Sequence, residues 1–222
     1  MRYKTDRLNM RQIIERYILF LIGLFVASLG VAFSTKAGLG TSPVASVPYS
    51  VSLFSHIFTF GGWLNVWSMM QIFVQIILLR RKCKIVEIVI QTVLAFAYGY
   101  LTNFSCYLIS GIHVDTYLMQ FACLIFSCFV LGFGIWIQLK GNVAMLPGEA
   151  MNRAVSYVAG KKYENVKIFF DILYIALSVL ISVLLVGELK GVREGSIIAA
   201  VMIGNIIKMY NRIWEKLTAA GD

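Results

Sequence analysis

Charged side chains are scarce in this sequence of 222 residues: Asp, Glu, Lys and Arg make up 14% of it, whereas hydrophobic residues make up 59%. An average soluble domain has about 25% charged residues, so this composition excludes an ordinary soluble fold. Long uncharged runs are present instead, and each approaches or exceeds the roughly 17–25 residues of a membrane-crossing helix. These runs cover residues 17–35, 63–79, 88–112 and 116–139. We therefore predict an all-α, polytopic membrane protein with one membrane domain, residues 1–222.

Enzyme motifs and metal-ligand patterns are also missing from the sequence. It contains no phosphate-binding GxxxxGK motif followed by Ser or Thr, no HExxH, no GxSxG and no cluster of His and Cys. The four cysteines lie mostly in apolar segments without metal-ligand spacing, which is typical of small buried hydrophobic residues; they are Cys83, Cys106, Cys123 and Cys128. We therefore expect no catalytic residue, no metal and no cofactor, and hence a protein that is not an enzyme.

Acidic residues are outnumbered by basic ones, 11 against 20, which gives a net charge of +9. A basic balance can indicate nucleic-acid binding, but here the Lys and Arg residues cluster in short segments between apolar runs. Cytoplasmic loops of membrane proteins hold such an excess of Lys and Arg. The charge therefore indicates orientation in a membrane and argues against a nucleic-acid partner.

Proline is rare, and two of the three prolines open matching segments. Residues 36–52 (KAGLGTSPVASVPYSVS) and 140–156 (KGNVAMLPGEAMNRAVS) each interrupt an apolar run, and Pro43 or Pro147 then restarts a helix. We predict short helices at about 43–58 and 143–158. Pro48 is expected to bend the first short helix or to mark its end.

These segments belong to an internal repeat with a shift of 104 residues. The repeat units are residues 17–110 and 116–212, approximately. The identical pairs between positions 25 and 52 and their counterparts are Phe25 and Phe129, Val26 and Val130, Gly30 and Gly134, Lys36 and Lys140, Pro43 and Pro147, Val51 and Val155, and Ser52 and Ser156.

Charge placement decides between two topologies for this repeat. If both short helices crossed the bilayer, there would be eight spans, and the basic cluster at residues 80–84 would face outward against the positive-inside bias. If both are re-entrant or broken, six spans remain, with residues 195–210 as the shortest, and both termini lie inside. Three of the 20 basic residues then lie outside: Lys36, Lys190 and Arg193. Three spans in each repeat make the two halves inverted.

Inverted repeats with broken helices at matching positions are typical of transporters, whose sites lie near the bilayer midplane. Irregular backbone is tolerated in a bilayer only where it is buried in protein or lines a wet cavity. A helix that begins inside the membrane directs free N–H groups and a partial positive charge at what precedes it. Two such starts, near Thr41 and Leu146, can approach each other from opposite faces and bind an anionic group.

Four candidate residues stand at the two breaks, and each has a structural alternative. The hydroxyls of Thr41 and Ser42 are candidates for contact with a solute, or they cap their own helix. Lys36 and Lys140 occupy equivalent positions in the repeat. They are candidates for attracting an anion, or they are interfacial lysines that anchor helix ends.

Ionisable residues at membrane depth provide the remaining candidates. Glu149 and Arg153, spaced i, i+4, either bind solute or couple protons, or they neutralise each other as a helical ion pair. Asp171 lies inside an apolar span, opposite Gln71 in the repeat. It is a candidate for proton coupling together with Glu149, or it pairs with Lys167.

The segment around the first break also resembles a known family. Gly30-Val31-Ala32 and the following KAGLGTSP, which ends at Pro43, are similar to the YczE/YyaS/YitT group of small bacterial membrane proteins. The resemblance covers nearly the whole chain in length and span layout. It implies a multi-pass protein of the bacterial cytoplasmic membrane, and it provides no established substrate or site residue.

Three functions remain open at this stage. The leading hypothesis is secondary transport of a small, anionic solute through a midplane site between the two broken helices. The second is a solute-binding subunit of a multi-component importer, and the third is an accessory or scaffold membrane protein. The expected partners are membrane lipid and a small solute, with a homo-oligomer or a partner protein left open.

Overall fold

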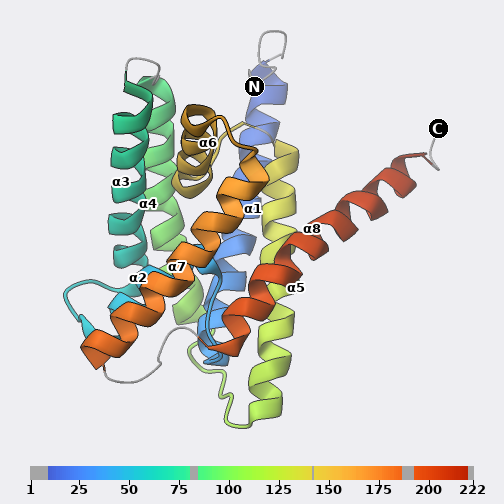
Figure 1. Ribbon diagram of the computed structural model, residues 1–222. Helices are drawn as coiled ribbons and strands as arrows, with labels where there is room; N and C mark the ends of the chain where they lie inside the picture. The colour runs from blue at the N-terminus through green and yellow to red at the C-terminus, as the bar shows by residue number, and fades with distance from the viewer. Residues whose placement is uncertain (1–9, 81–84, 142, 187–192, 220–222) are drawn as a thin grey trace.

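The fold consists of eight helices in a computed structural model that describes residues 10–80, 85–141, 143–186 and 193–219 (Figure 1). Every regular element in these ranges is helical. The helices are α1 (Met10–Ala37), α2 (Pro43–Phe54), α3 (Phe60–Leu79), α4 (Ile85–Leu108), α5 (Tyr117–Gly141), α6 (Pro147–Ala159), α7 (Tyr163–Val186) and α8 (Glu194–Ala219).

Five of these helices are long and apolar enough to cross a membrane: α1, α3, α4, α5 and the Asn165–Leu184 part of α7. The protein is therefore a polytopic helical membrane protein, as its composition predicts. The predicted span at 195–210 lies within α8, which is not among these five helices. Its apolar run is interrupted by Asn205, Lys208 and Arg212, and the helix continues nine residues past Tyr210, from 211 to 219.

Several predicted boundaries differ from the observed ones. Helix α1 begins at Met10, seven residues before the predicted apolar run at 17–35. The short helices are shorter than predicted, since α2 ends at Phe54 and α6 begins at Pro147. Pro48 lies inside α2 and does not end it. Residues 81–84 of the basic cluster at 80–84 lie outside the described residues, and so does Lys190.

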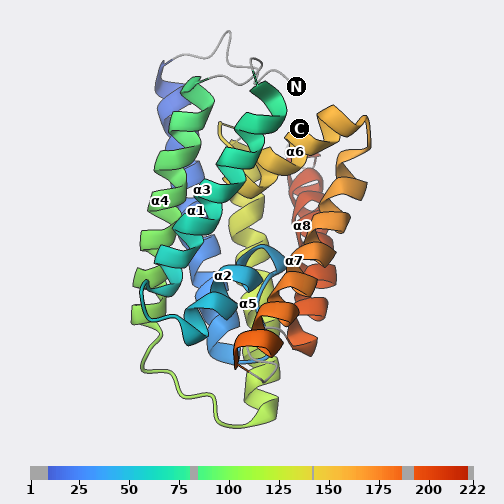
Figure 2. The same cartoon turned by 60° about the vertical axis from the view of Figure 1, so that its left-hand side comes forward.

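The two short helices lie at opposite ends of the bundle (Figures 1 and 2). We call the end where α1 begins the upper end, as Figure 1 draws it, and the other the lower end. Helix α1 descends, α2 occupies the lower half, α3 ascends and α4 descends. In the second half of the chain each direction is reversed: α5 ascends, α6 occupies the upper half, α7 descends and α8 ascends.

The packed helix pairs repeat between the two halves with one exception. Helices α1 and α5 pack against each other at the centre; α4 packs on α1 as α8 packs on α5; and α2 packs on α7 as α6 packs on α3. The exception is α3 and α4, which form a packed pair, whereas α7 and α8 do not within the described residues. Helix α8 instead leads away from the bundle towards its C-terminus (Figure 1).

The central α1–α5 pair depends on glycines. A Cβ built at Gly30 would lie 2.5 Å from the backbone N of Leu131, and one built at Gly134 would lie 2.4 Å from the backbone N of Ala27. These two contacts are equivalent under the shift of 104, because Leu131 is the counterpart of Ala27. Small residues let membrane helices approach this closely and gain van der Waals contact and weak hydrogen bonds.

We predict that Gly30→Ala destabilises the protein, because the added methyl group would overlap backbone atoms of α5 that cannot rotate away. Overpacking of this kind costs about 1–3 kcal/mol. The measurement is the thermal unfolding midpoint in detergent. The matched control is Gly204→Ala on α8, where an added Cβ meets nothing within 4 Å; this change is expected to stabilise by up to about 1 kcal/mol. Equal midpoints for the two variants would contradict the role of Gly30.

Candidate functional site

The first break, residues 38–42, is closed over by protein. Gly38 and Gly40 have positive φ angles of 69° and 107°, which turn the chain back into the bundle. The start of α8 covers this turn, since the Gly195 backbone N–H donates to the Leu39 carbonyl at 2.9 Å. Thr41 is wholly buried. The Gly40 carbonyl accepts from the Ser34 hydroxyl at 3.1 Å, so the buried part of this break, residues 39–41, has its Leu39 and Gly40 carbonyls bonded within the protein, as irregular structure in a bilayer requires.

Neither hydroxyl at this break caps α2 in the expected way. Ser42 occupies the N-cap position, but its side chain makes no cap hydrogen bond. The Thr41 hydroxyl has no hydrogen-bond partner among the described residues. A wholly buried hydroxyl without a partner carries a desolvation cost of about 1–3 kcal/mol. Thr41 therefore remains a candidate for a function that the resting structure does not use.

A ladder of buried serines joins α2 to α7 below the break. The Ser46 hydroxyl donates mainly to the Pro43 carbonyl at 2.7 Å and lies 3.4 Å from the Tyr174 carbonyl, while the Ser178 hydroxyl donates to the Ser46 carbonyl at 3.0 Å. The Ser50 hydroxyl is hydrogen-bonded to that of Ser178 and accepts from that of Ser182. All four serines are at most 1% exposed. The lower half of the molecule is thus sealed where α2 meets α7.

The second break, which precedes α6, lines a cavity instead. A cavity of about 410 Å³ lies between α3, α4 and α6, and we call it the α6 cavity. Val143, Ala144 and Met145 of the break line it, together with Arg153 of α6. The volume lies within the range of small-molecule sites, about 300–1,000 Å³. The same sequence feature is therefore closed in one half and accessible in the other.

Polar groups converge on the α6 cavity. Gln75 of α3 and Gln91 of α4 line it, and both side chains are buried, with Oε1 atoms that have no hydrogen-bond partner among the described residues. A second, smaller cavity of about 50 Å³ is lined by Glu149 and Gln138. Arg153 lines both cavities. The Glu87 carboxylate and Ser156 also line the α6 cavity. The Arg153 guanidinium and the two carboxamide acceptors can hold a small polar solute there, with one carboxylate nearby.

The starts of the two short helices meet in the middle of the bundle. A Cβ built at Gly148 of α6 would lie 3.6 Å from Val44 Cγ1 of α2 and 3.4 Å from the side-chain amide of Gln71. The Gln71 amide donates to the Tyr174 hydroxyl at 3.3 Å. Val47 and Tyr174 belong to one buried apolar cluster, and Val44 packs against it. Arg153 lines the α6 cavity. Thr41 and Ser42 do not line it, because they belong to the first break, where the lower half is sealed.

The two equivalent lysines make specific contacts at opposite ends of the bundle. Lys36 Nζ donates to the Ser110 carbonyl just beyond α4 at 2.9 Å. Lys140 Nζ lies 5.7 Å from the ring centroid of Trp136 and 5.5 Å from that of Trp214, which are cation–π distances. These contacts agree with the alternative in which both lysines anchor helix ends. Neither lysine lines the α6 cavity.

Asp171 forms the predicted ion pair with Lys167, at 3.1 Å between Nζ and Oδ2. The pair lies on α7, one turn before Tyr174. A role for Asp171 in proton coupling stays a prediction.

Sequence reasoning missed the residues that distinguish the two halves. Gln75 and Gln91 stand inside apolar spans, where an amide is uncommon enough to be noticed. The serine ladder has a weaker signal: Ser46 and Ser50, and also Ser178 and Ser182, are spaced i, i+4 and therefore share a helix face.

Comparisons with known proteins identify a family and leave the activity open. The family model described as "Family of unknown function (DUF6198)" matches residues 14–212. The chain is also 26% identical over 133 residues to the "Uncharacterized protein YyaS" of Bacillus subtilis (strain 168). That match covers 60% of this chain and 64% of the relative, so the chain spans a little under two thirds of its length. No solved structure matches.

We predict unequal chemical access to the two breaks, tested at equivalent positions. Met145 lines both cavities, whereas its counterpart Thr41 is wholly buried. In a protein whose native cysteines are replaced by alanine, a water-soluble maleimide should label Met145→Cys readily. It should label Thr41→Cys about a hundredfold more slowly, because local opening of buried structure costs several kcal/mol. Labelling of the unfolded proteins in denaturant is the control, and equal rates in the folded proteins would refute the asymmetry.

Proposed function

Because the chain belongs to the DUF6198 family, whose function is not established, we propose its function from its geometry: secondary transport of a small, anionic solute past the two broken helices. The observation that supports it is the unequal access to two matched breaks. In transporters built from inverted repeats, two equivalent halves exchange conformations around one site near the midplane. In one of these two conformations, the first break would be closed and the second break would be open.

The proposed membrane architecture is the inverted repeat with six spans and two re-entrant helices. Reversed chain directions, short helices at opposite ends and equivalent helix pairs support it. The sixth span is then the first half of α8, whose Lys208 reaches the interface by extending its side chain. The fourth helix of each half makes the main departure from symmetry, since α4 packs on α3 and α8 is separate from α7.

The proposed solute site is the α6 cavity, continued by the smaller cavity at Glu149. Arg153 lines both and provides the cation for an acidic group on the solute. The carboxamide oxygens of Gln75 and Gln91 accept hydrogen bonds, so the solute also carries N–H or O–H donors. Glu149 lies at the start of α6 and is the proposed proton-coupling residue. No catalytic step is part of this proposal.

The proposed exchange of conformations opens the serine ladder and closes the α6 cavity. In the observed state the hydroxyls of Ser50 and Ser178 bind each other. Separation of α2 from α7 would expose Thr41 and Ser42, while α6 would close on α3 and α4. Hydroxyl ladders suit such a change, because each hydroxyl can exchange a protein partner for water at little net cost.

The proposed orientation places the upper end and both termini in the cytoplasm. Lys140, Lys161 and Lys162 lie at this end, where α5 ends and α7 begins, and the positive-inside rule assigns such residues to the cytoplasm. The α6 cavity then belongs to a state that faces the cytoplasm. The match to a bacterial protein supports the bacterial cytoplasmic membrane as the location.

We predict this orientation to be measurable in intact cells that express the protein without its native cysteines. Ile57→Cys lies between α2 and α3, at a residue 76% exposed, and should react with a membrane-impermeant maleimide added outside. Lys161→Cys, exposed between α6 and α7, should react only after the cells are opened. The reverse pattern would overturn the orientation.

We predict that Arg153→Gln reduces uptake of the transported acid into proteoliposomes by up to about fivefold, since a charge contact at an exposed side chain contributes up to about 1 kcal/mol. Glu149→Gln should abolish accumulation driven by a proton gradient and retain exchange of labelled for unlabelled solute. The assay is uptake from a panel of small carboxylic and phosphorylated compounds.

The matched control is Lys161→Gln, which removes an equal charge from an exposed residue outside the cavity and should leave uptake unchanged. Thermal stabilisation by each compound provides a readout that does not need transport. Absence of uptake and of stabilisation across the panel would refute transport of a small acid. Stabilisation without uptake would favour the solute-binding subunit of a multi-component importer.

A further inference from the structure

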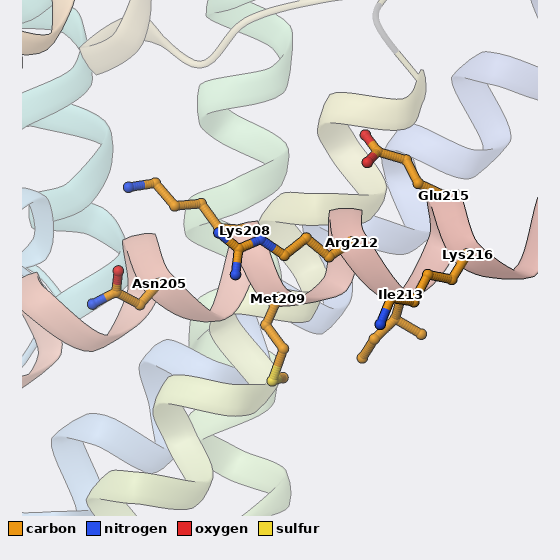
Figure 3. A pocket seen from close by; sticks show the side chains of 7 residues that line it. All are labelled: Asn205, Lys208, Met209, Arg212, Ile213, Glu215 and Lys216. Atoms are coloured by element: carbon orange, nitrogen blue, oxygen red, sulfur yellow. The ribbon is translucent and has the colours of Figure 1, made fainter.

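The C-terminal half of α8 presents a basic and apolar surface that the proposed transport function does not use. This half extends from the bundle (Figure 1), and α8 lacks the packed neighbour that α4 has in α3. An open groove of about 550 Å³ runs along it, and all of its lining residues among those that the structure describes belong to α8. We call this the α8 groove, and Figure 3 shows its side chains.

The α8 groove has two chemically distinct edges. Lys208, Arg212 and Lys216 are spaced four residues apart and provide three cations. Met209 and Ile213 form the apolar edge, and both side chains are exposed, by 38% and 47%. In Figure 3, Lys208 and Arg212 extend on one side of α8, whereas Met209 and Ile213 extend on the other, where the Lys216 side chain also lies. Glu215 is the single carboxylate of the lining, against three cations.

This arrangement fits a phospholipid with a negatively charged head group. Cationic side chains can hold phosphate oxygens, and the adjoining apolar edge can cover the upper part of an acyl chain. Each Lys or Arg near an anionic membrane surface contributes about 1 kcal/mol of attraction. Free phosphate or a nucleotide would use the cations and leave the apolar edge exposed. A second copy of this chain would bring like charges against the first.

We propose that the α8 groove is a binding site for an anionic phospholipid such as phosphatidylglycerol, which holds the C-terminal half of α8 at the membrane interface. Trp214, 45% exposed on this half of α8, suits the same depth, because tryptophan favours the head-group region. The inference is independent of transport, since the groove shares no lining residue with the α6 cavity.

The test uses the full chain and its variants in nanodiscs of phosphatidylcholine that contain a small fraction of phosphatidylglycerol. It compares how much phosphatidylglycerol each protein retains. Retained lipid is counted by native mass spectrometry after release into detergent, and labelled phosphatidylglycerol measures affinity. Lys208→Gln combined with Arg212→Gln should weaken phosphatidylglycerol binding about twenty- to thirtyfold, because each removed cation corresponds to about a fivefold loss. Binding of phosphatidylcholine should stay unchanged.

The matched control is Lys161→Gln combined with Lys162→Gln, which removes the same charge from exposed residues at the turn between α6 and α7. This control should retain the wild-type preference. A second variant, Met209→Ser with Ile213→Ser, keeps the cations and should also weaken lipid binding. If both double glutamine variants lost the same amount of phosphatidylglycerol binding, net charge alone would explain the effect and the proposed site would be overturned. Competition by inorganic phosphate as strong as by lipid, or a dimer that the groove variants dissociate, would overturn the assignment to lipid.

Discussion

The arrangement of this protein depends on the contact between α1 and α5, where two backbones meet without intervening side chains. A Cβ at Gly30 or at Gly134 would overlap the opposite helix, at 2.5 and 2.4 Å from its nearest backbone atom. Within a bilayer, where apolar side chains gain little by leaving lipid, close backbone approach is a main source of helix association. The two contacts are related by the shift of 104 residues, because each glycine meets the counterpart of the residue that the other glycine meets. The α2–α7 and α6–α3 pairs pack around this central pair.

The bilayer imposes a second constraint, which the two breaks satisfy differently. Each break has backbone groups outside a helix, and such groups must be bonded within the protein or reach water. At the first break the Leu39 carbonyl accepts a hydrogen bond from Gly195, and residues 39–41 are buried. At the second break, Val143 to Met145 line the α6 cavity, which provides access to water. One break is closed and the matching break lines a cavity. The proposed exchange between two conformations requires such a difference between matching segments.

The sequence predicts the class and the breaks because those depend on local composition. Uncharged runs identify the spans, and glycine followed by proline at Pro43 and Pro147 identifies where helices stop and restart. It does not predict which break is closed, because that depends on contacts between distant segments. Ser46 and Ser178 are ordinary serines in apolar helices until α2 is placed on α7. Likewise, Gln75 and Gln91 become a pair of acceptors only after α3 and α4 are placed beside α6. The last predicted span is not among the five long apolar helices for a local reason, since polar residues dilute the second half of α8.

The fourth helix of each half packs differently, and it lies near the break that differs between the halves. Helix α8 is not packed on α7, and its first turn lies over the first break, where Gly195 meets Leu39. Its counterpart α4 is packed along α3, and its early residue Gln91 lines the α6 cavity. A helix held by its neighbour leaves the nearby break accessible, whereas a helix free of that neighbour covers it. Exchange of these two arrangements would open the first break and close the second without altering the α1–α5 contact. The lipid proposed at the α8 groove acts on this same element, because a head group that holds α8 at the interface also keeps it away from α7.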